Sequence, residues 1–142
     1  MIWLQTGLGI VGNPKILARF PSQENCIGYL EKIRWGDAVE CPYCGATNCV
    51  RSQRRWYCYA CRTSFSVTVG TVFHHTHLPL QKWFLAIDLI LNDTKGISAV
   101  RLSRYLGVNK DTAWRMNVRI RLAMLDRDQR RLMDGILSIT DT

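Results

Sequence analysis

Six cysteines lie in this chain, and four of them stand in two closely spaced pairs. Cys41 and Cys44 form the first pair, in the run Cys-Pro-Tyr-Cys-Gly, and Cys58 and Cys61 form the second, in Cys-Tyr-Ala-Cys. Two Cys-x-x-Cys pairs separated by thirteen residues have the ligand spacing of a structural zinc site, in which four thiolates surround one Zn²⁺. We therefore predict that these four cysteines bind Zn²⁺.

The alternative is that the cysteines form disulfide bonds in a secreted protein. The first twelve residues are apolar, but they lack a basic segment and a clear cleavage site of small residues, so they do not indicate a secretory signal. The paired spacing also favours metal over disulfides. Of the two remaining cysteines, Cys26 falls in a helical pattern, where a buried free thiol is expected, and Cys49 lacks the paired geometry of the zinc ligands.

The elements around the cysteines must hold each pair in a tight turn. Gly45 directly follows the first pair and tolerates the positive φ that such a turn needs. The run 49–57 predicts strand structure that carries the chain across and back between the pairs. Residues 38–70 are therefore typical of a zinc ribbon, a small antiparallel β structure. A ribbon of about thirty residues buries too little apolar surface to fold alone, so metal binding is expected to supply its folding free energy.

Two helical stretches should flank the ribbon, which makes the predicted fold class α+β. Residues 1–17 show no periodicity and are expected to be a disordered leader. Ser22 is a plausible N-cap for a helix that runs to about Trp35 and packs on the ribbon through Tyr29 and Trp35. After the second cysteine pair, apolar and polar residues alternate over 63–73, which predicts a strand with one buried face.

The second half of the chain carries a helix-turn-helix pattern. One apolar helix begins near Leu78-Pro79, a second is capped by Ser98 and ended by Gly107, and a third begins at Asn109 or Lys110. A helix, a three-residue turn with Gly and another helix are the signature of a helix-turn-helix motif, and a plain helical hairpin with a solvated charged face is the alternative.

Basic residues concentrate on these two modules. The net charge of the 142-residue chain is +8; residues 41–72 carry +4 and residues 97–125 carry +5. This distribution favours a polyanion partner over a merely soluble surface. The candidate DNA contacts are Arg51, Arg54, Arg55 and Arg62 in the ribbon and Lys110, Thr112, Trp114, Arg115 and Arg119 in the third helix, where Trp114 could instead belong to a core.

His74, His75 and His77 raise the possibility of a second metal site. Because the four-cysteine site is already complete, we expect them to form hydrogen bonds or to face solvent. The chain contains no apolar run of the roughly 18 to 20 residues that would cross a membrane. With its unpaired thiols it is expected in a reducing cytoplasm.

Residues 18–125 resemble the N-terminal region of bacterial insertion-sequence transposases that carry a zinc ribbon. The resemblance rests on the cysteine motifs and on the runs Phe-Ser-Val-Thr, Gly-Thr-Val-Phe-His-His-Thr-His-Leu-Pro-Leu, Lys-Gly-Ile-Ser-Ala and Thr-Ala-Trp-Arg-Met. Gly36 and Tyr59 depart from the family pattern but remove no ligand. The resemblance implies binding to double-stranded DNA, at the terminal repeats of a mobile element.

In that family, an RNase H-like domain with three carboxylates follows and holds two catalytic metal ions. Here the pattern breaks off after Gly135, and Asp141 alone matches the position of a first catalytic aspartate. The expectation is therefore a truncated transposase that binds DNA and is not itself an enzyme. The expected organisation is a leader (1–17), a helix and zinc ribbon (18–73), a helix-turn-helix segment (74–130) and the start of a missing catalytic domain (131–142).

Two other functions stay open. The ribbon could instead be a protein-interaction module, in which Trp35, Trp56, Tyr57 and Tyr59 dock a partner such as full-length transposase or a second copy. An active nuclease or transferase is the third possibility, and it lacks the carboxylates that a two-metal mechanism needs.

Overall fold

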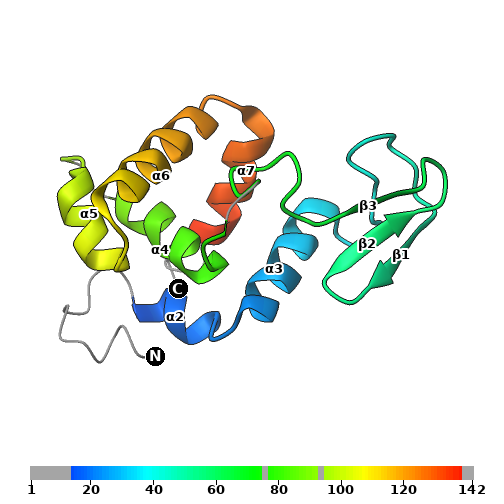
Figure 1. Cartoon of the computed structure of the whole chain (residues 1–142), viewed down its shortest axis with the longest axis horizontal. Coiled ribbons are helices and arrows are strands. Elements are labelled where there is room, and N and C mark those ends of the chain that lie inside the picture. The colour runs from blue at the N-terminus through cyan, green and yellow to red at the C-terminus, as the bar shows by residue number, and fades with distance from the viewer. Residues whose placement is uncertain (1–13, 75–76, 93–94, 139–142) are drawn as a thin grey trace.

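The computed structural model describes residues 14–74, 77–92 and 95–138. Helices gather into a bundle, and a small sheet extends from one side of it (Figure 1). Both parts meet at one helix near the N-terminus, so the chain has the α+β architecture that its sequence predicts. In chain order the elements are α2 (Pro14–Arg19), α3 (Gln23–Trp35), β1 (Cys49–Ser52), β2 (Arg55–Cys58), β3 (Thr63–Phe65), α4 (Leu80–Leu91), α5 (Ala99–Leu106), α6 (Lys110–Ala123) and α7 (Arg127–Leu137).

Helix α3 begins and ends where the sequence indicates. The Ser22 hydroxyl accepts a hydrogen bond from the Asn25 backbone N–H at 3.3 Å, which caps the first turn. Gly36 ends the helix with φ of 63°, a conformation that glycine adopts without steric cost. Cys26, Ile27 and Leu30 on its inner face join the helical core, so α3 belongs to the bundle as well as to the ribbon.

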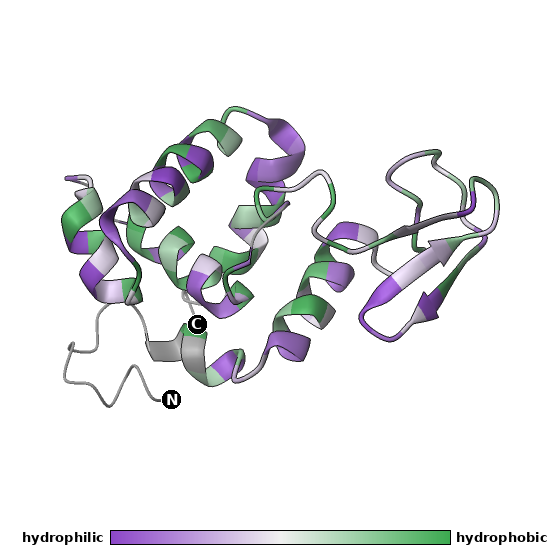
Figure 2. Cartoon of the chain, viewed as in Figure 1, coloured by the Kyte–Doolittle hydropathy of each residue, from purple (hydrophilic) through white to green (hydrophobic). Residues whose placement is uncertain are grey.

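Helix α4 forms the centre of the bundle. It is buried over most of its circumference, as its apolar sequence predicts, and it contacts α2, α3, α5, α6 and α7. Figure 2 shows hydrophilic residues at the start of α7 and at the tip of the β-hairpin, away from this core. The apolar cluster around α4 is thus the main core of the protein, and it contains no part of the sheet.

Helices α5 and α6 are joined by the predicted three-residue turn. Gly107 adopts the left-handed conformation with φ of 68°, and its N–H donates to the Ser103 carbonyl at 2.9 Å. The Asn109 side chain accepts from the Thr112 N–H at 2.7 Å and caps α6. Leu102, Leu106, Ala113 and Met116 are buried between the helices. The two helices therefore pack on each other across a three-residue turn, which is the element order that a helix-turn-helix requires.

The sheet has the antiparallel order β1-β2-β3. The run 49–57 is a hairpin rather than one continuous strand, because Gln53 and Arg54 form a two-residue turn in which Gln53 has φ of 57°. A separate small core is formed by Cys41 together with Cys58 of β2 and Phe65 of β3. Cys41 and Cys58 of the two cysteine pairs are part of this second core, and Cys61 packs against it.

Three predictions of local structure differ from the observed elements. The leader was expected to be unstructured to residue 17, but α2 begins at Pro14 and buries Ile16 completely, while residues 1–13 lie outside the described part. The strand expected over 63–73 ends at Phe65; Val67, Val72 and Phe73 are instead buried in turns against the bundle. The domain boundary expected at residue 131 falls inside α7, which buries Leu132, Met133 and Ile136.

Candidate metal centre and nucleic-acid interface

The four cysteines of the two pairs converge beside the sheet. Their sulfur atoms all lie within 4.8 Å of one another. The Sγ–Sγ distance is 3.7 Å between Cys41 and Cys61 and 3.6 Å between Cys44 and Cys58. A tetrahedron with Zn–S bonds of about 2.3 Å has edges of about 3.8 Å, whereas a disulfide bond is about 2.05 Å long. The thiols are free, and their arrangement fits one Zn²⁺ ion.

Tight turns aim the sulfurs at one point. In the first turn, the Gly45 N–H donates to the Cys41 carbonyl at 2.9 Å, and the Cys41 N–H donates to the Ala46 carbonyl at 2.9 Å. Gly45 has φ of 78°, which confirms the reason for a glycine directly after the pair. In the second turn Arg62 takes the left-handed conformation with φ of 56°, although it is not a glycine and its residue type does not predict this conformation.

The thiols influence one another's ionisation. The pKa of Cys58 is lowered to about 6, first by the backbone N–H of Cys61 and further by the Cys44 thiol, which outweigh the effect of desolvation. At Cys44 a backbone hydrogen bond with Ala46 lowers the pKa, but desolvation and the neighbouring thiols prevail and raise it to about 12. Four cysteine sulfurs that lie this close together are suited to bind a cation, because binding would release the protons of the thiols.

Glu31 of α3 anchors the ribbon to the bundle. Its carboxylate accepts from Arg51 Nη1 at 2.8 and 2.9 Å and from Trp56 Nε1 at 2.9 Å. Trp35 at the end of α3 packs edge-on against Trp56 and Phe65, with ring centroids 6.1 and 5.8 Å apart. Trp35 thus packs on the ribbon as predicted. Tyr29 does not, because its hydroxyl donates to the Gly135 carbonyl in α7.

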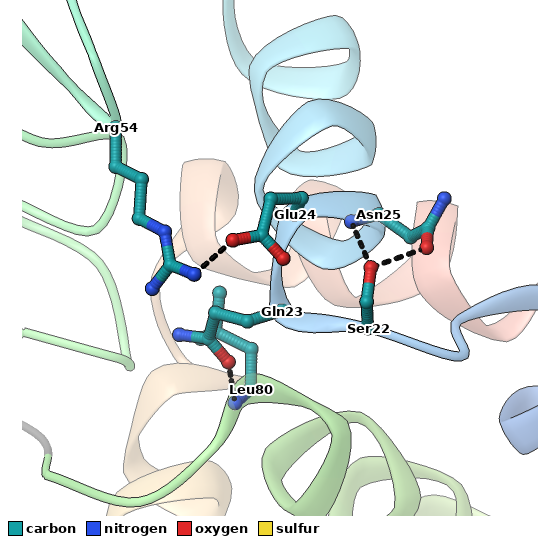
Figure 3. A network of polar contacts seen from close by, with 6 residues as sticks. All are labelled: Ser22, Gln23, Glu24, Asn25, Arg54 and Leu80. Atoms are coloured by element: carbon teal, nitrogen blue, oxygen red, sulfur yellow. Dashed lines mark hydrogen bonds and ion pairs between the residues drawn. The ribbon is translucent and has the colours of Figure 1, made fainter.

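The four ribbon arginines differ in whether an acidic side chain of the protein already binds their guanidinium group. Arg51 is bound to Glu31, and Arg54 forms an ion pair with Glu24 across the gap to α3 (Figure 3). In the same view Gln23 accepts from the Leu80 N–H at 2.9 Å and ties the start of α3 to α4.

The other two ribbon arginines face solvent. Arg55 donates to the Ser64 hydroxyl at 3.1 Å and is exposed, as is Arg62. Among the described residues, Arg55 and Arg62 have no ion-pair partner, whereas Arg51 and Arg54 each pair with a glutamate of α3.

Helix α6 presents the remaining candidates in two groups. Lys110, Trp114 and Arg115 are exposed near its N-terminus, and Trp114 is 59% exposed rather than packed in a core. Thr112 is half-buried beside the cap. Arg119 lies on the flank: its guanidinium donates to the His74 carbonyl and sits 5.9 Å from the Trp83 ring. Arg119 thus has a partner inside the protein that its position in the sequence did not reveal.

Sequence reasoning missed an apolar stripe on the exposed side of α6. Leu122 is 62% exposed and Leu125, just past the helix, is 84% exposed. Together with Trp114 and half-buried Val118 they recur at three- and four-residue steps. This spacing places them on the face opposite Ala113, Met116 and Ile120, and it could have predicted the stripe from the sequence.

The histidines do not join a second metal centre in the described residues. Within 14–74, 77–92 and 95–138, the cysteine cluster is the one group of three or more His, Cys, Asp or Glu side chains arranged to hold an ion. His74 Nδ1 accepts from the Gly70 N–H at 3.4 Å, His77 is exposed, and His75 lies outside the described residues. In this same part of the chain, every helix is too short or too polar to cross a bilayer.

Comparison with known proteins agrees with this site. Residues 21–64 match the family model of the transposase zinc-ribbon domain. The chain is 40% identical over 73 residues to a protein of Halobacterium salinarum described as an uncharacterized protein in transposable element ISH50. That alignment takes in 48% of this chain and 25% of the relative, so the matched part spans a quarter of that protein. No solved structure shows a significant match.

The family-model match spans α3 and the sheet as far as Ser64, so this segment is similar to the transposase zinc-ribbon domain. It confirms the resemblance that the cysteine motifs indicate, and it supports Zn²⁺ as the ion for Cys41, Cys44, Cys58 and Cys61.

Proposed function

We propose that this chain binds double-stranded DNA as the recognition part of an insertion-sequence transposase, at the terminal repeats of the element. The observation that carries the proposal is the exposed N-terminal half of α6, which presents Lys110, Trp114 and Arg115 while its opposite face is buried against the bundle. In a helix-turn-helix the second helix enters the major groove through this half. The similarity of residues 21–64 to the transposase zinc-ribbon domain supports DNA as the negatively charged partner of this basic chain.

Each candidate residue has a distinct role in this proposal. Arg115 lies one turn into α6 and is placed to reach a guanine edge or a phosphate, and Lys110 and Thr112 lie near the helix start, where phosphates bind. Arg55 and Arg62 supply phosphate contacts from the ribbon. Arg51 and Arg119 contribute mainly by holding the ribbon and α6 in position, because each has a partly buried acidic or carbonyl partner. Arg54 pairs with Glu24 at the exposed surface and remains close enough to solvent to contact a phosphate.

The test compares Arg115→Ala with Arg51→Ala in DNA titrations over a range of salt. Loss of a phosphate contact should reduce the slope of log K against log salt by about 0.9. We expect that change for Arg115→Ala, whereas Arg51→Ala should act chiefly through stability. If Arg115→Ala leaves the affinity for the terminal repeat and for random duplex unchanged, α6 is not the recognition helix.

We propose binding rather than strand transfer as the role of the described residues. Transposase chemistry through two metal ions needs several carboxylates brought together on one scaffold. Incubation of the pure protein with a terminal-repeat duplex and Mg²⁺ or Mn²⁺ is the check, since metal-dependent strand cleavage would overturn this assignment. Free thiols throughout the chain support a reducing cytoplasm as its site of action.

A second candidate function is self-association, and the apolar stripe on α6 favours it. Leu122 at the end of α6 and Leu125 just beyond it are 62% and 84% exposed, and two copies of the chain would bury them by packing together through this stripe. The aromatic surface expected on the ribbon is less suited to docking a partner, because Trp35 and Trp56 pack against each other. Of these aromatic residues, Tyr59 is the most exposed.

Sedimentation of the wild-type chain and Leu122→Glu without DNA tests this second candidate. A concentration-dependent dimer that the variant abolishes would support it, and a monomer at all concentrations would refute it. Tyr59→Glu is the control, since it adds the same charge at an exposed aromatic residue of the ribbon.

A further inference from the structure

Cys49 lies beside the metal centre without belonging to it. It is the first residue of β1 and stands directly opposite Cys58 of β2. Directly opposite residues of antiparallel strands project from the same face of a sheet, so Cys49 lies on the face from which Cys58 reaches the cysteine cluster. Cys49 packs against the small core of Cys41, Cys58 and Phe65, and its thiol lies 3.6 Å from the Ala46 carbonyl.

The hydrogen bonds of the ladder define the kind of pair that Cys49 and Cys58 form. The Tyr59 N–H donates to the Asn48 carbonyl at 3.3 Å, so the neighbouring pair is hydrogen-bonded. Hydrogen-bonded and non-hydrogen-bonded pairs alternate along antiparallel strands. Cys49 and Cys58 are therefore a non-hydrogen-bonded pair, in which Cα atoms are about 4.5 Å apart. A disulfide needs Cα atoms about 4.4–6.8 Å apart, so this pair is within bonding range.

We propose that Cys49 and Cys58 form a cross-strand disulfide when the ribbon has lost its metal and meets a peroxide. The peroxide oxidises the Cys58 thiol to a sulfenic acid: its O–O bond breaks, one oxygen passes to the sulfur, and the other leaves as water. The Cys49 sulfur then attacks the Cys58 sulfur: the S–S bond forms, the S–O bond breaks, and the hydroxyl leaves as water with the Cys49 proton. Two electrons pass from the two sulfurs to the peroxide.

Other cysteines compete with Cys49 for a disulfide bond to Cys58, since the Sγ atoms of Cys44 and Cys58 are 3.6 Å apart. The turn that carries Cys41 and Cys44 lies in the loop between α3 and β1, and the metal ion would hold that turn against the second pair. The β1–β2 hairpin is held by its own ladder across a two-residue turn. Loss of metal should therefore free Cys44 more than Cys49, and leave Cys49 as the partner that stays in place.

The disulfide would switch the ribbon off reversibly. With Cys58 bonded to Cys49, only Cys41, Cys44 and Cys61 of the ligand set remain, and a closed structural zinc site requires four ligands. A dithiol reductant would regenerate both thiols and permit zinc to bind again. Zinc-bound Cys58 should be protected, because its sulfur is occupied by the metal.

The experiment treats the 142-residue chain with hydrogen peroxide before and after removal of zinc. Free thiols are alkylated, the chain is digested with trypsin, and linked peptides are read by mass spectrometry. Cleavage after Arg51 and Arg55 separates Cys49 from Cys58, and fragment spectra then identify the linked cysteines. We expect a Cys49–Cys58 link as the major product of the zinc-free chain and little of it in the zinc-loaded chain.

Two variants complete the test. After peroxide, zinc uptake should be lost in the wild type and recovered with dithiothreitol, whereas Cys49→Ser should retain several-fold more zinc uptake at the same low dose. Cys26→Ser is the matched control and should behave as wild type, because Cys26 is fully buried in the helical core. A major Cys44–Cys58 or Cys41–Cys61 link, or equal loss of zinc uptake in wild type and Cys49→Ser, would overturn the proposal.

Discussion

Replacing Glu31 is the most direct way to test how the ribbon is attached to the bundle. The carboxylate is bound by the Arg51 guanidinium and by the Trp56 indole N–H, and these two donors come from adjacent strands. Its side chain is 15% exposed, and that of Arg51 is 46% exposed. Glu31→Ala removes both interactions, whereas Glu31→Gln can keep an oxygen acceptor for Trp56 and loses the charge that attracts Arg51.

The two variants should differ in their effect on the free energy of unfolding. A partly exposed ion pair contributes up to about 1 kcal/mol, and leaving a half-buried N–H without an acceptor costs about 1–3 kcal/mol. We therefore expect Glu31→Ala to lose about 2–3 kcal/mol and Glu31→Gln about 1 kcal/mol. In a chain of 142 residues, 1 kcal/mol lowers Tm by about 3 °C, so the expected shifts are about 6–9 °C and about 3 °C.

Thermal unfolding of the zinc-loaded chain, followed by tryptophan fluorescence, measures both shifts. Glu24→Gln is the matched control: Glu24 also pairs with a ribbon arginine, but that pair is exposed on both sides, so Tm should hardly change. Equal shifts for Glu31→Ala and Glu31→Gln would mean that the Trp56 hydrogen bond contributes nothing. Shifts no larger than that of Glu24→Gln would refute the anchoring role of Glu31.

Three further outcomes follow from the fold. Chelation of zinc should disorder the sheet and leave most helical circular dichroism intact, because the bundle has a core separate from that of the ribbon; simultaneous loss of both would contradict this. Gly107→Ala should cost about 1–2 kcal/mol in urea unfolding, because an L-residue is strained at φ of 68°, and an unchanged midpoint would exclude that strain. Arg119→Ala should lower Tm, since it loses its contacts with His74 and Trp83, whereas Arg115→Ala should weaken DNA binding and leave Tm unchanged.

The features that the sequence predicts best are those encoded by a few neighbouring residues. The spacing of the two cysteine pairs identifies a metal site because two short turns suffice to build it. Ser22 and Gly36 bound α3, and Ser98 and Gly107 bound α5, because caps act through hydrogen bonds over three or four residues and through glycine at positive φ.

The features that it predicts poorly depend on distant contacts. Alternation over 63–73 correctly indicates burial of Phe65 and Val67, but burial does not require a strand: after Phe65 the chain turns toward the bundle, and Val67 packs there. Helix α7 was overlooked because its first turns are dense in charge, and its apolar side chains are recognisable as a face only against α3 and α4. Arg51 and Arg54 look like free cations in sequence, since the acids that bind them lie 20 and 30 residues earlier, in α3.

Native mass spectrometry of the chain mixed with a terminal-repeat duplex tests the central claim most directly, because one spectrum reports metal and DNA together. The account predicts one zinc per chain, a complex with duplex formed by the zinc-loaded chain, and far less complex after chelation. A chain that retains no zinc, or a zinc-loaded chain that forms no complex at low salt, would contradict it.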